Sequence, residues 1–337
     1  MKLLRILLFP LALLYGIITA IRNLLYDKGL LKSYTFPVPV IAVGNLSAGG
    51  TGKTPQIEYL IRLLSGRYRV ATLSRGYKRR SKGFIIADNT VNADILGDEP
   101  YQFFRKFPGI KVAVDANRKN GIEQLLALQD KPQIVLLDDA YQHRRVKAGY
   151  YILLTAYGDL YNDDFILPTG NLREHRWGAK RADVIIVTKC PAHLTKEDRM
   201  KIQYKLKPKP YQKVYFTYIS YDDKVYSDID SLEISEILQH KIAVLAGIAK
   251  PDPFINYLAC ADSISLVYPD HHNFTDKEIA HLRSITDERL IVTTEKDFVR
   301  LRGKLPPDKL YYLPIKNNFL VEGADFDKKI IEYIERE

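Results

Sequence analysis

The chain has 337 residues, of which 46% are hydrophobic and 27% charged, so a disordered chain is excluded and two globular domains are expected. The formal net charge of +10 favours anionic partners, such as phosphates, nucleic acids or an acidic membrane surface. The only two cysteines, Cys190 and Cys260, lie far apart, which excludes a disulfide framework or a cysteine-rich metal site and suits a reducing cytoplasm.

The N-terminal segment, residues 1–30, carries an uncharged apolar run from Ile6 to Ala20. As a helix this run is about 24 Å long, whereas a full membrane crossing needs roughly 20 residues. No convincing signal-peptide cleavage site is present, and positive side chains flank the run on both sides. We predict a helix that lies in the membrane surface, and two alternatives stay open: a single spanning helix and a buried helix.

Short apolar runs alternate with helical patterns through the first two thirds of the chain. Continuous runs of Val, Ile and Leu, separated by helices, indicate a mostly parallel sheet that is covered on both faces. We therefore predict an α/β domain over residues 31–210. Its strands are expected within residues 38–45, 68–76, 111–117, 133–140, 150–156 and 182–190.

A Tyr-rich alternating stretch, residues 212–223, interrupts this pattern before a second set of strands and helices begins at residue 241. We predict a linker or hinge over residues 211–238 and a smaller α/β domain over residues 239–337. A late strand, residues 309–315, could return to pair with the Tyr-rich stretch and complete a two-stranded hinge.

The stretch GNLSAGGTGKT, residues 44–54, follows the first buried strand and opens a helix. It matches the phosphate-binding pattern G-x-x-x-x-G-K-[ST], except that Ser47 stands in place of the first glycine. Backbone N–H groups at a helix N-terminus bind phosphate oxygens, so we predict a P-loop NTPase-like domain that binds the phosphates of a nucleotide together with Mg²⁺. Lys53 would reach the β- and γ-phosphates and Thr54 would bind Mg²⁺. The predicted nucleotide-binding residues are Gly49, Gly50, Thr51, Gly52, Lys53 and Thr54.

Two carboxylates, Asp138 and Asp139, end the hydrophobic run of residues 133–140. In a P-loop fold this is where an acidic residue holds the Mg²⁺ shell. In strand geometry the two side chains would point to opposite faces, and either could contact the metal. Gln142 and His143 follow at the edge where ligands bind in open α/β sheets. The alternative is a helix-capping Asp followed by a solvated run of charge.

Basic residues gather after other strands in the same domain. The loop of residues 73–83 holds five cations, including Arg75, and Arg118 and Arg173 occur at comparable positions. Such a cluster favours an anion site, although a solvated basic loop would have the same composition. The acidic pair of LGDEP, residues 96–100, resembles by itself a helix cap followed by a first-turn Glu.

Seven motifs occur along the chain in the order GNLSAGGTGKTP, SRGYKR, GDEP, LDDAYQHRR, LPTGNLRE, PDHHNF and TEKD. As a set they resemble the tetraacyldisaccharide 4'-kinase family, the lipid A 4'-kinases of Gram-negative bacteria. The resemblance covers nearly the whole chain. It implies an inner-membrane-associated P-loop kinase with two α/β domains. It also implies transfer of the γ-phosphate of ATP to the 4'-hydroxyl of a glucosamine disaccharide 1-phosphate that carries four acyl chains.

The resemblance also assigns roles to individual residues. Asp98 of GDEP is implied as the catalytic base, paired with His271 of the second domain or, as the weaker alternative, with His272. Lys53 and Mg²⁺ would stabilise charge on the transferred phosphoryl group. The candidate clamps for phosphate or substrate are Arg75, Arg118, Gln142, His143, Arg173 and Glu174.

The implied substrate explains the apolar N-terminus, because a lipid with four acyl chains stays in the bilayer. We expect two partners, the lipid A disaccharide precursor and an anionic membrane surface, on the cytoplasmic face of the inner membrane. Two other function classes fit less well. A GTPase switch would carry an N-K-x-D signature, and a nucleic-acid binder would need aromatic platforms among its cations. Most of the 23 tyrosines lie elsewhere, so no nucleic-acid partner is expected.

Overall fold

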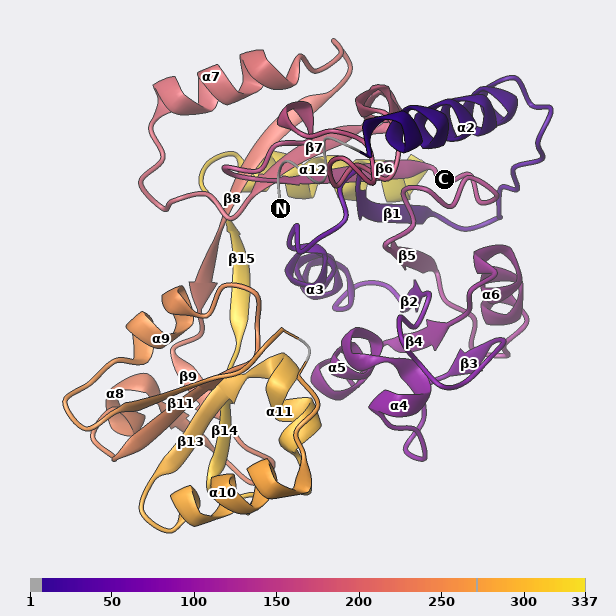
Figure 1. The fold of residues 1–337 in the computed structure, drawn as a ribbon. Helices are drawn as coiled ribbons and strands as arrows, with labels where there is room; N and C mark the ends of the chain where they lie inside the picture. Colours follow the sequence, from indigo (N-terminus) through magenta and orange to yellow (C-terminus); the bar gives the residue numbers. More distant parts are fainter. Residues whose placement is uncertain (1–7, 271, 337) are drawn as a thin grey trace. The chain divides into compact units, whose positions relative to one another are not determined.

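The computed structural model describes residues 8–270 and 272–336, which form two compact units. The first unit comprises the described residues up to Ile219 together with those from Asn317 onward. The second unit comprises Ser220–Lys316. Each unit is an α/β structure built on its own sheet, which confirms the predicted fold class (Figure 1).

Among the described residues, the first unit contains a nine-stranded sheet in the order β15-β8-β7-β6-β1-β5-β2-β4-β3. The seven strands from β8 to β4 in this order are parallel, and β3 is antiparallel to β4. At the other edge β15 is antiparallel to β8, because Leu320 bonds to Phe216 and Asp222 to Pro314. The strands are β1 Val40–Asn45, β2 Val70–Ser74, β3 Ile85–Ile86, β4 Lys111–Val114, β5 Ile134–Asp138, β6 Tyr150–Ala156, β7 Val184–Thr188, β8 Lys213–Tyr221 and β15 Ile315–Phe319.

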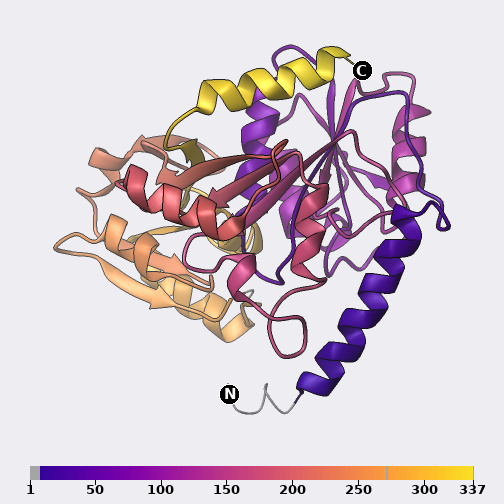
Figure 2. The same ribbon diagram turned by 90° about the horizontal axis from the view of Figure 1, so that it is seen from above.

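Helices cover both faces of this sheet, because successive strand residues point to opposite sides. Ile41 and Val43 of β1 belong to a core that includes α3, α5 and α12, whereas Val40 and Ala42 pack with α6. Figure 2 shows α12 along one side of the sheet and α2 away from it. The helices are α2 Phe9–Asp27, α3 Lys53–Leu64, α4 Ala93–Leu96, α5 Asp98–Lys106, α6 Arg118–Leu126, η1 Tyr161–Asp163, η2 Arg176–Arg181, α7 Lys196–Leu206 and α12 Gly323–Arg336.

The second unit contains, in its described residues, a six-stranded sheet in the order β10-β9-β14-β13-β11-β12. Its four strands from β14 to β12 are parallel, and β9 and β10 form an antiparallel edge. The strands are β9 Lys224–Tyr226, β10 Ser231–Glu233, β11 Ile242–Ala246, β12 Ile264–Val267, β13 Leu290–Thr294 and β14 Leu310–Leu313. The helices are α8 Ile234–Ile237, α9 Asp252–Leu258, α10 Asp276–Thr286 and α11 Glu295–Leu301.

The division between the units differs from the predicted boundaries at residues 210, 238 and 337. The Tyr-rich stretch is not a linker, because β8 is a full member of the large sheet. The C-terminal segment leaves the second unit: Phe326, Ile330 and Ile334 of α12 are buried in the core of the first. The strand that returns to β8 is β15, whereas the predicted one, residues 309–315, contains β14 of the second sheet. The apolar stripe of α12 explains this return, since it needs a sheet face to cover it.

Candidate functional site

The glycine-rich stretch of residues 44–54 runs from the end of β1 to the start of α3. Gly49 and Gly52 have φ angles of 132° and 81°, which residues with a side chain rarely adopt. Ser47, which replaces the usual first glycine, is buried and bridges to Leu172, and it has no positive φ. The loop therefore does not use the conformational freedom that a glycine at position 47 would add.

Polar side chains at the start of the loop and after β7 hold this loop in place. Asn45 donates its amide to Thr51 Oγ1 at 2.7 Å, and Thr188 donates its hydroxyl to the Thr51 carbonyl at 2.8 Å. Lys189 Nζ donates to the Gly50 carbonyl at 2.5 Å. Sequence analysis missed all three supporting residues. Thr188 and Lys189 could have been found from their place at the end of β7, since parallel strands end at one edge of the sheet.

Asp139 follows β5 and draws two cations together beside the loop. Its φ angle of 48° shows that it leaves strand geometry, so the expected alternation with Asp138 does not apply. The Asp139 carboxylate lies 3.5 Å from Lys53 Nζ and 3.0 Å from Arg173 Nη1. Burial alone would raise the pKa of Asp139, but Lys53 and Arg173 hold that pKa below its usual value. Asp139 is thus an anion that positions both side chains.

Asp138, the last residue of β5, has the features of a metal ligand. It is 4% exposed, and its Oδ1 atom has no hydrogen-bond partner. Burial, followed by the nearby charge of Glu99, raises the pKa of Asp138 to about 7. A divalent cation would supply the missing partner and favour the charged form. The residues present therefore fit Mg²⁺, with Thr54 in the first turn of α3 as a second candidate ligand.

The described residues contain no group of three or more His, Cys, Asp or Glu side chains that could hold a metal ion together. This suits Mg²⁺ at a nucleotide site, because Mg²⁺ keeps several waters and is shared between one or two carboxylates and substrate phosphates.

Arg118 is buried beside the two carboxylates at the start of α6. It is 3% exposed and donates to the carbonyl oxygens of Asp115 at 3.0 Å and Asp138 at 3.5 Å. Burial lowers the pKa of Arg118 to about 10, which leaves it charged at neutral pH. Asp138 and Asp139 oppose this shift and Arg75 adds to it, so these groups share one electrostatic cluster. The structure thus brings Arg75 and Arg118 to the predicted edge.

His143 lies in the same region but differs from the arginines in charge. Burial is the largest influence, followed by Arg118, Arg22 and Arg145, and together they lower the pKa of His143 to about 4. The imidazole is therefore neutral at physiological pH. It can offer a hydrogen bond to a substrate, but not a positive charge to a phosphate.

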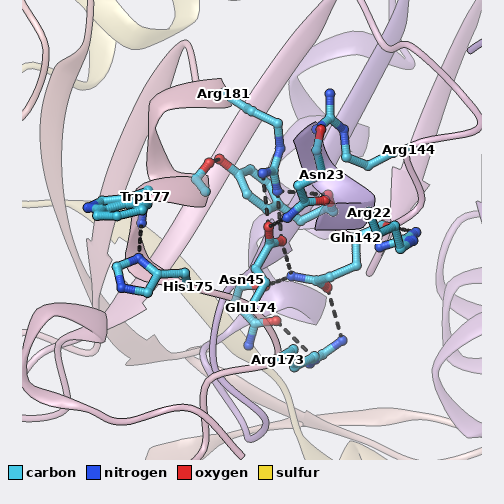
Figure 3. A network of polar contacts seen from close by, with 12 residues as sticks. Arg22, Asn23, Asn45, Gln142, Arg144, Arg173, Glu174, His175, Trp177 and Arg181 are labelled. Atoms are coloured by element: carbon cyan, nitrogen blue, oxygen red, sulfur yellow. Dashed lines mark hydrogen bonds and ion pairs between the residues drawn. The ribbon is translucent and has the colours of Figure 1, made fainter. Parts of the chain in front are cut away.

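Gln142 and Glu174 belong to a polar network that connects the site to the N-terminal helix (Figure 3). Gln142 donates to the Asn45 carbonyl at 2.8 Å and to Glu174 at 3.1 Å. Glu174 is 2% exposed and accepts two N–H groups of Arg181 at 2.7 and 2.9 Å, and one of Asn23 at 2.6 Å. In the described structure, Glu174 therefore serves the protein's own network, whereas Arg173 points to Asp139 and Asn45.

Side chains of the N-terminal helix α2 donate hydrogen bonds to backbone carbonyl groups of several of these residues. Tyr15 donates to the Arg173 carbonyl at 2.8 Å, and Arg22 donates to the Gln142 carbonyl at 2.8 Å. At the end of the helix Asp27 pairs with Arg144 at 2.7 Å. Sequence analysis treated Arg22 as a flanking cation and missed that its side chain binds the loop after β5.

Asp98 is the first residue of α5, and Gly97 precedes it with a φ of 93°. It therefore lies in the first turn of the helix rather than at its N-cap. A side chain at position 97 would lie 3.2 Å from the Tyr77 carbonyl, so the start of α5 packs against the basic loop of residues 73–83. The influence of Glu99 on Asp138 also places this turn at the edge that holds the glycine-rich loop.

Of the two histidines predicted as partners of Asp98, the structure describes only His272. His271 lies outside the described residues. The ring of His272 stacks on Tyr268, and its Nε2 atom lies 3.0 Å from both carboxylate oxygens of Glu278. Glu278 also closes a capping box with Thr275 at the start of α10. His272 is thus engaged within its own unit.

The comparisons with known proteins agree in one family. The family model described as tetraacyldisaccharide-1-P 4'-kinase matches residues 4–335. Two curated proteins named tetraacyldisaccharide 4'-kinase are similar over 99% of this chain and 98% of their own length: one from Flavobacterium johnsoniae at 58% identity and one from Flavobacterium psychrophilum at 60%. A crystal structure of LpxK from Aquifex aeolicus in complex with ATP is similar with a TM-score of 0.78 at 31% identity, covering 98% of this chain and 99% of that one.

The network around Glu174 generates a stability prediction. Glu174→Ala leaves the buried Arg181 guanidinium without its carboxylate, so we expect a loss of about 3–5 kcal/mol in the free energy of unfolding. Urea denaturation of the full chain measures this loss. The double variant Glu174→Ala, Arg181→Met should recover part of it, because no buried charge is left unpaired. Glu123→Ala, which breaks an exposed pair with Lys119, is the control and should cost less than about 1 kcal/mol. Equal losses in Glu174→Ala and Glu123→Ala would contradict the buried-pair interpretation.

Proposed function

The chain belongs to the family of tetraacyldisaccharide-1-phosphate 4'-kinases, and on that basis we propose how its residues carry out the reaction. It is an ATP-dependent kinase of lipid A biosynthesis that phosphorylates the 4'-hydroxyl of a tetraacylated glucosamine disaccharide 1-phosphate. One observation carries the assignment of the site. Because β1 pairs in parallel with β5, with Val43 opposite Asp138, the glycine-rich loop and the two carboxylates end side by side.

The glycine-rich loop binds the phosphates of ATP. Backbone N–H groups at the start of α3 donate to the phosphate oxygens, and Gly49, Gly50 and Gly52 let the backbone approach them. Lys53 binds the β- and γ-phosphates and offsets the charge that develops during transfer. Its present partner Asp139 is 3.5 Å away and partly exposed, a weak pairing that a phosphate can replace.

Asp138 and Thr54 hold Mg²⁺, and Asp139 supports them by positioning Lys53 and Arg173. The metal ion would neutralise charge on the triphosphate and help to align it. The unpartnered Oδ1 atom of Asp138 supports this role. Arg75, Arg118 and Arg173 supply positive charge around the phosphates.

Asp98 accepts the proton of the attacking 4'-hydroxyl, and the family resemblance implies His271 as its partner. The position of Asp98 at the start of α5, near the ends of β2 and β5, supports this role. His271 is preferred to His272 because the His272 ring is engaged by Glu278 and Tyr268. A carboxylate base is effective here because the sugar hydroxyl is deprotonated only as the phosphoryl group arrives.

The helix α2 lies in the cytoplasmic surface of the inner membrane and brings the site to the lipid substrate. Among the described residues it is the one helix long and apolar enough to cross a membrane. Its polar side is bonded to the protein along much of its length, from Tyr15 to Asp27. On its other side Leu14, Ile18 and Ile21 are more than half exposed. A helix held in this way presents one apolar face, which favours attachment to the surface over a crossing.

A direct assay tests the reaction and the loop together. Purified protein with ATP, Mg²⁺ and detergent-dispersed tetraacyldisaccharide 1-phosphate should form the 4'-phosphorylated product. Lys53→Ala should lower kcat by at least about a hundredfold, since it removes a fixed charge from the transferring phosphoryl group. Lys328→Ala, on the exposed side of α12, is the control and should keep wild-type turnover. Absence of product with the wild-type chain would refute the function, and an active Lys53→Ala variant would refute the loop's role.

Asp98→Asn tests the proposed base without changing the size of the side chain. We expect kcat to fall by about a hundredfold or more, because general-base catalysis contributes on that scale. The affinity for ATP, measured by equilibrium binding, should stay within about twofold of wild type. A variant that loses ATP binding or its folded structure instead would show that Asp98 has a structural role.

Vesicle binding tests the orientation of α2. The triple variant Leu14→Ser, Ile18→Ser, Ile21→Ser should bind neutral phosphatidylcholine vesicles at least about a hundredfold more weakly, because each side chain loses apolar burial. Ile229→Ser, at an exposed position of the second unit, should bind as wild type does. In a Lys2→Cys variant the new thiol should react with an impermeant maleimide added outside the vesicles. Protection of that thiol would indicate a spanning helix.

A further inference from the structure

A cavity of about 620 Å³ opens in the first unit between η1, η2 and the C-terminal end of α7. This volume is typical of sites for small molecules. None of the proposed nucleotide or metal ligands lines it, so it is distinct from the site described above. Its lining includes Arg176, Trp177, Lys180, Lys205, Lys207 and Lys209.

The cavity has an excess of positive charge. Five cations line it, against one carboxylate, that of Asp163. Lys205 pairs with Asp163 at 2.7 Å and Lys180 with Asp27 at 2.9 Å. Lys207 and Lys209 have no carboxylate within 4 Å in the described part of the chain. These two ammonium groups are therefore available to an anion.

The exposed side chain of Trp177 lines the cavity together with these cations, and two exposed tyrosines lie on the segments that carry the lining lysines. Trp177 is 72% exposed, and the Trp177 ring lies against His175 with ring centroids 4.2 Å apart. Tyr204 and Tyr211 are 81% and 62% exposed, and the Tyr211 hydroxyl bonds to the Lys180 carbonyl at 2.6 Å. Large exposed aromatic rings are costly on a purely aqueous surface. Together with lysine and arginine they are typical of the level of lipid headgroups.

The cavity is also attached directly to the membrane helix. Lys180 of its lining pairs with Asp27, the last residue of α2, and the segment that leads into η2 carries Glu174, which binds Asn23 (Figure 3). A side chain at position 16 of α2 would lie 3.2 Å from Ile166, so Gly16 lets the helix approach the segment that carries Ile166. When the apolar side of α2 enters a bilayer, these contacts hold the η2 side of the cavity close to the bilayer surface.

We propose that this cavity binds the phosphate-bearing headgroup of an anionic phospholipid of the surrounding membrane, separately from the lipid that is phosphorylated. The proposal rests on the membrane attachment proposed above and adds a polar contact to the apolar one of α2. The charge of the cavity matches a phosphate, and the aromatic side chains beside it match the glycerol and upper acyl region of a lipid. A free phosphate ion carries the same negative charge as the headgroup, but it would make no use of the aromatic side chains.

The test uses the full chain and its only tryptophan, since Trp177 reports on the cavity itself. Vesicles of phosphatidylcholine, with and without phosphatidylglycerol, are titrated while bound protein and Trp177 emission are measured. Phosphatidylglycerol should strengthen binding and shift the emission to the blue. Phosphatidylglycerol should increase the affinity of the wild-type chain for vesicles. In the variant Lys207→Gln, Lys209→Gln this increase should be smaller by about fivefold per lysine, or roughly twenty-five-fold in all. The variant should keep wild-type binding to neutral vesicles and wild-type turnover in detergent.

A matched variant, Lys328→Gln, Lys329→Gln on α12, removes the same charge elsewhere and should retain at least most of the phosphatidylglycerol effect. Equal losses in the two double variants would overturn the proposal in favour of a diffuse charge effect. Loss of the phosphatidylglycerol effect on adding millimolar phosphate, but not sulfate at equal ionic strength, would assign the cavity to a free phosphate ion and overturn the lipid. Failure of the wild-type chain to bind neutral vesicles would instead contradict the attachment through α2.

Discussion

The parallel pairing of β1 with β5 is the constraint on which the rest of the site depends. Parallel strands end at the same edge, so the loop after β1 and the carboxylates after β5 meet there, where Lys53 pairs with Asp139. Both strands are buried on both faces, which leaves little freedom of register. The geometry of the proposed site is therefore set by two fully buried strands, and the loops beyond them are the parts that can adapt to a substrate.

The polar network around Glu174 extends this rigid edge outward to α2. An amphipathic helix at a chain terminus is usually tied down by apolar contacts alone, yet α2 buries only Ala12 and Thr19 among its described residues. Hydrogen bonds to the loops that hold Arg173 and Gln142 attach it instead. Because those loops also contact Asn45 in the glycine-rich loop, the helix proposed to meet the membrane and the loop proposed to bind phosphate share the same supports.

Much of this architecture could be predicted from the sequence, because buried parallel strands and a glycine-rich loop have strong local signatures. The position of Asp138 and Asp139 at the end of a strand could be predicted, whereas the left-handed backbone of Asp139 could not, since one residue after a strand carries no periodicity. The burial of Glu174 and its pairing with Arg181 could not be predicted, because both depend on how the chain between these two residues folds. The return of α12 to the first unit was missed because its apolar stripe shows that it packs, but not on which sheet.

The structure shows how the positive charges are distributed, which the composition of the chain cannot show. The net charge of +10 suggested one anionic partner, but the cations of the first unit fall into separate sets. Arg118 and Arg173 lie beside carboxylates at the sheet edge, where their charge is partly balanced until a phosphate or metal changes that balance. Lys207 and Lys209 line the cavity without such partners and remain attractive to an anionic group. A sequence counts these lysines and arginines alike. What the structure adds is which of them has a carboxylate beside it, because that carboxylate fixes the position of the cation and limits its attraction to other anions.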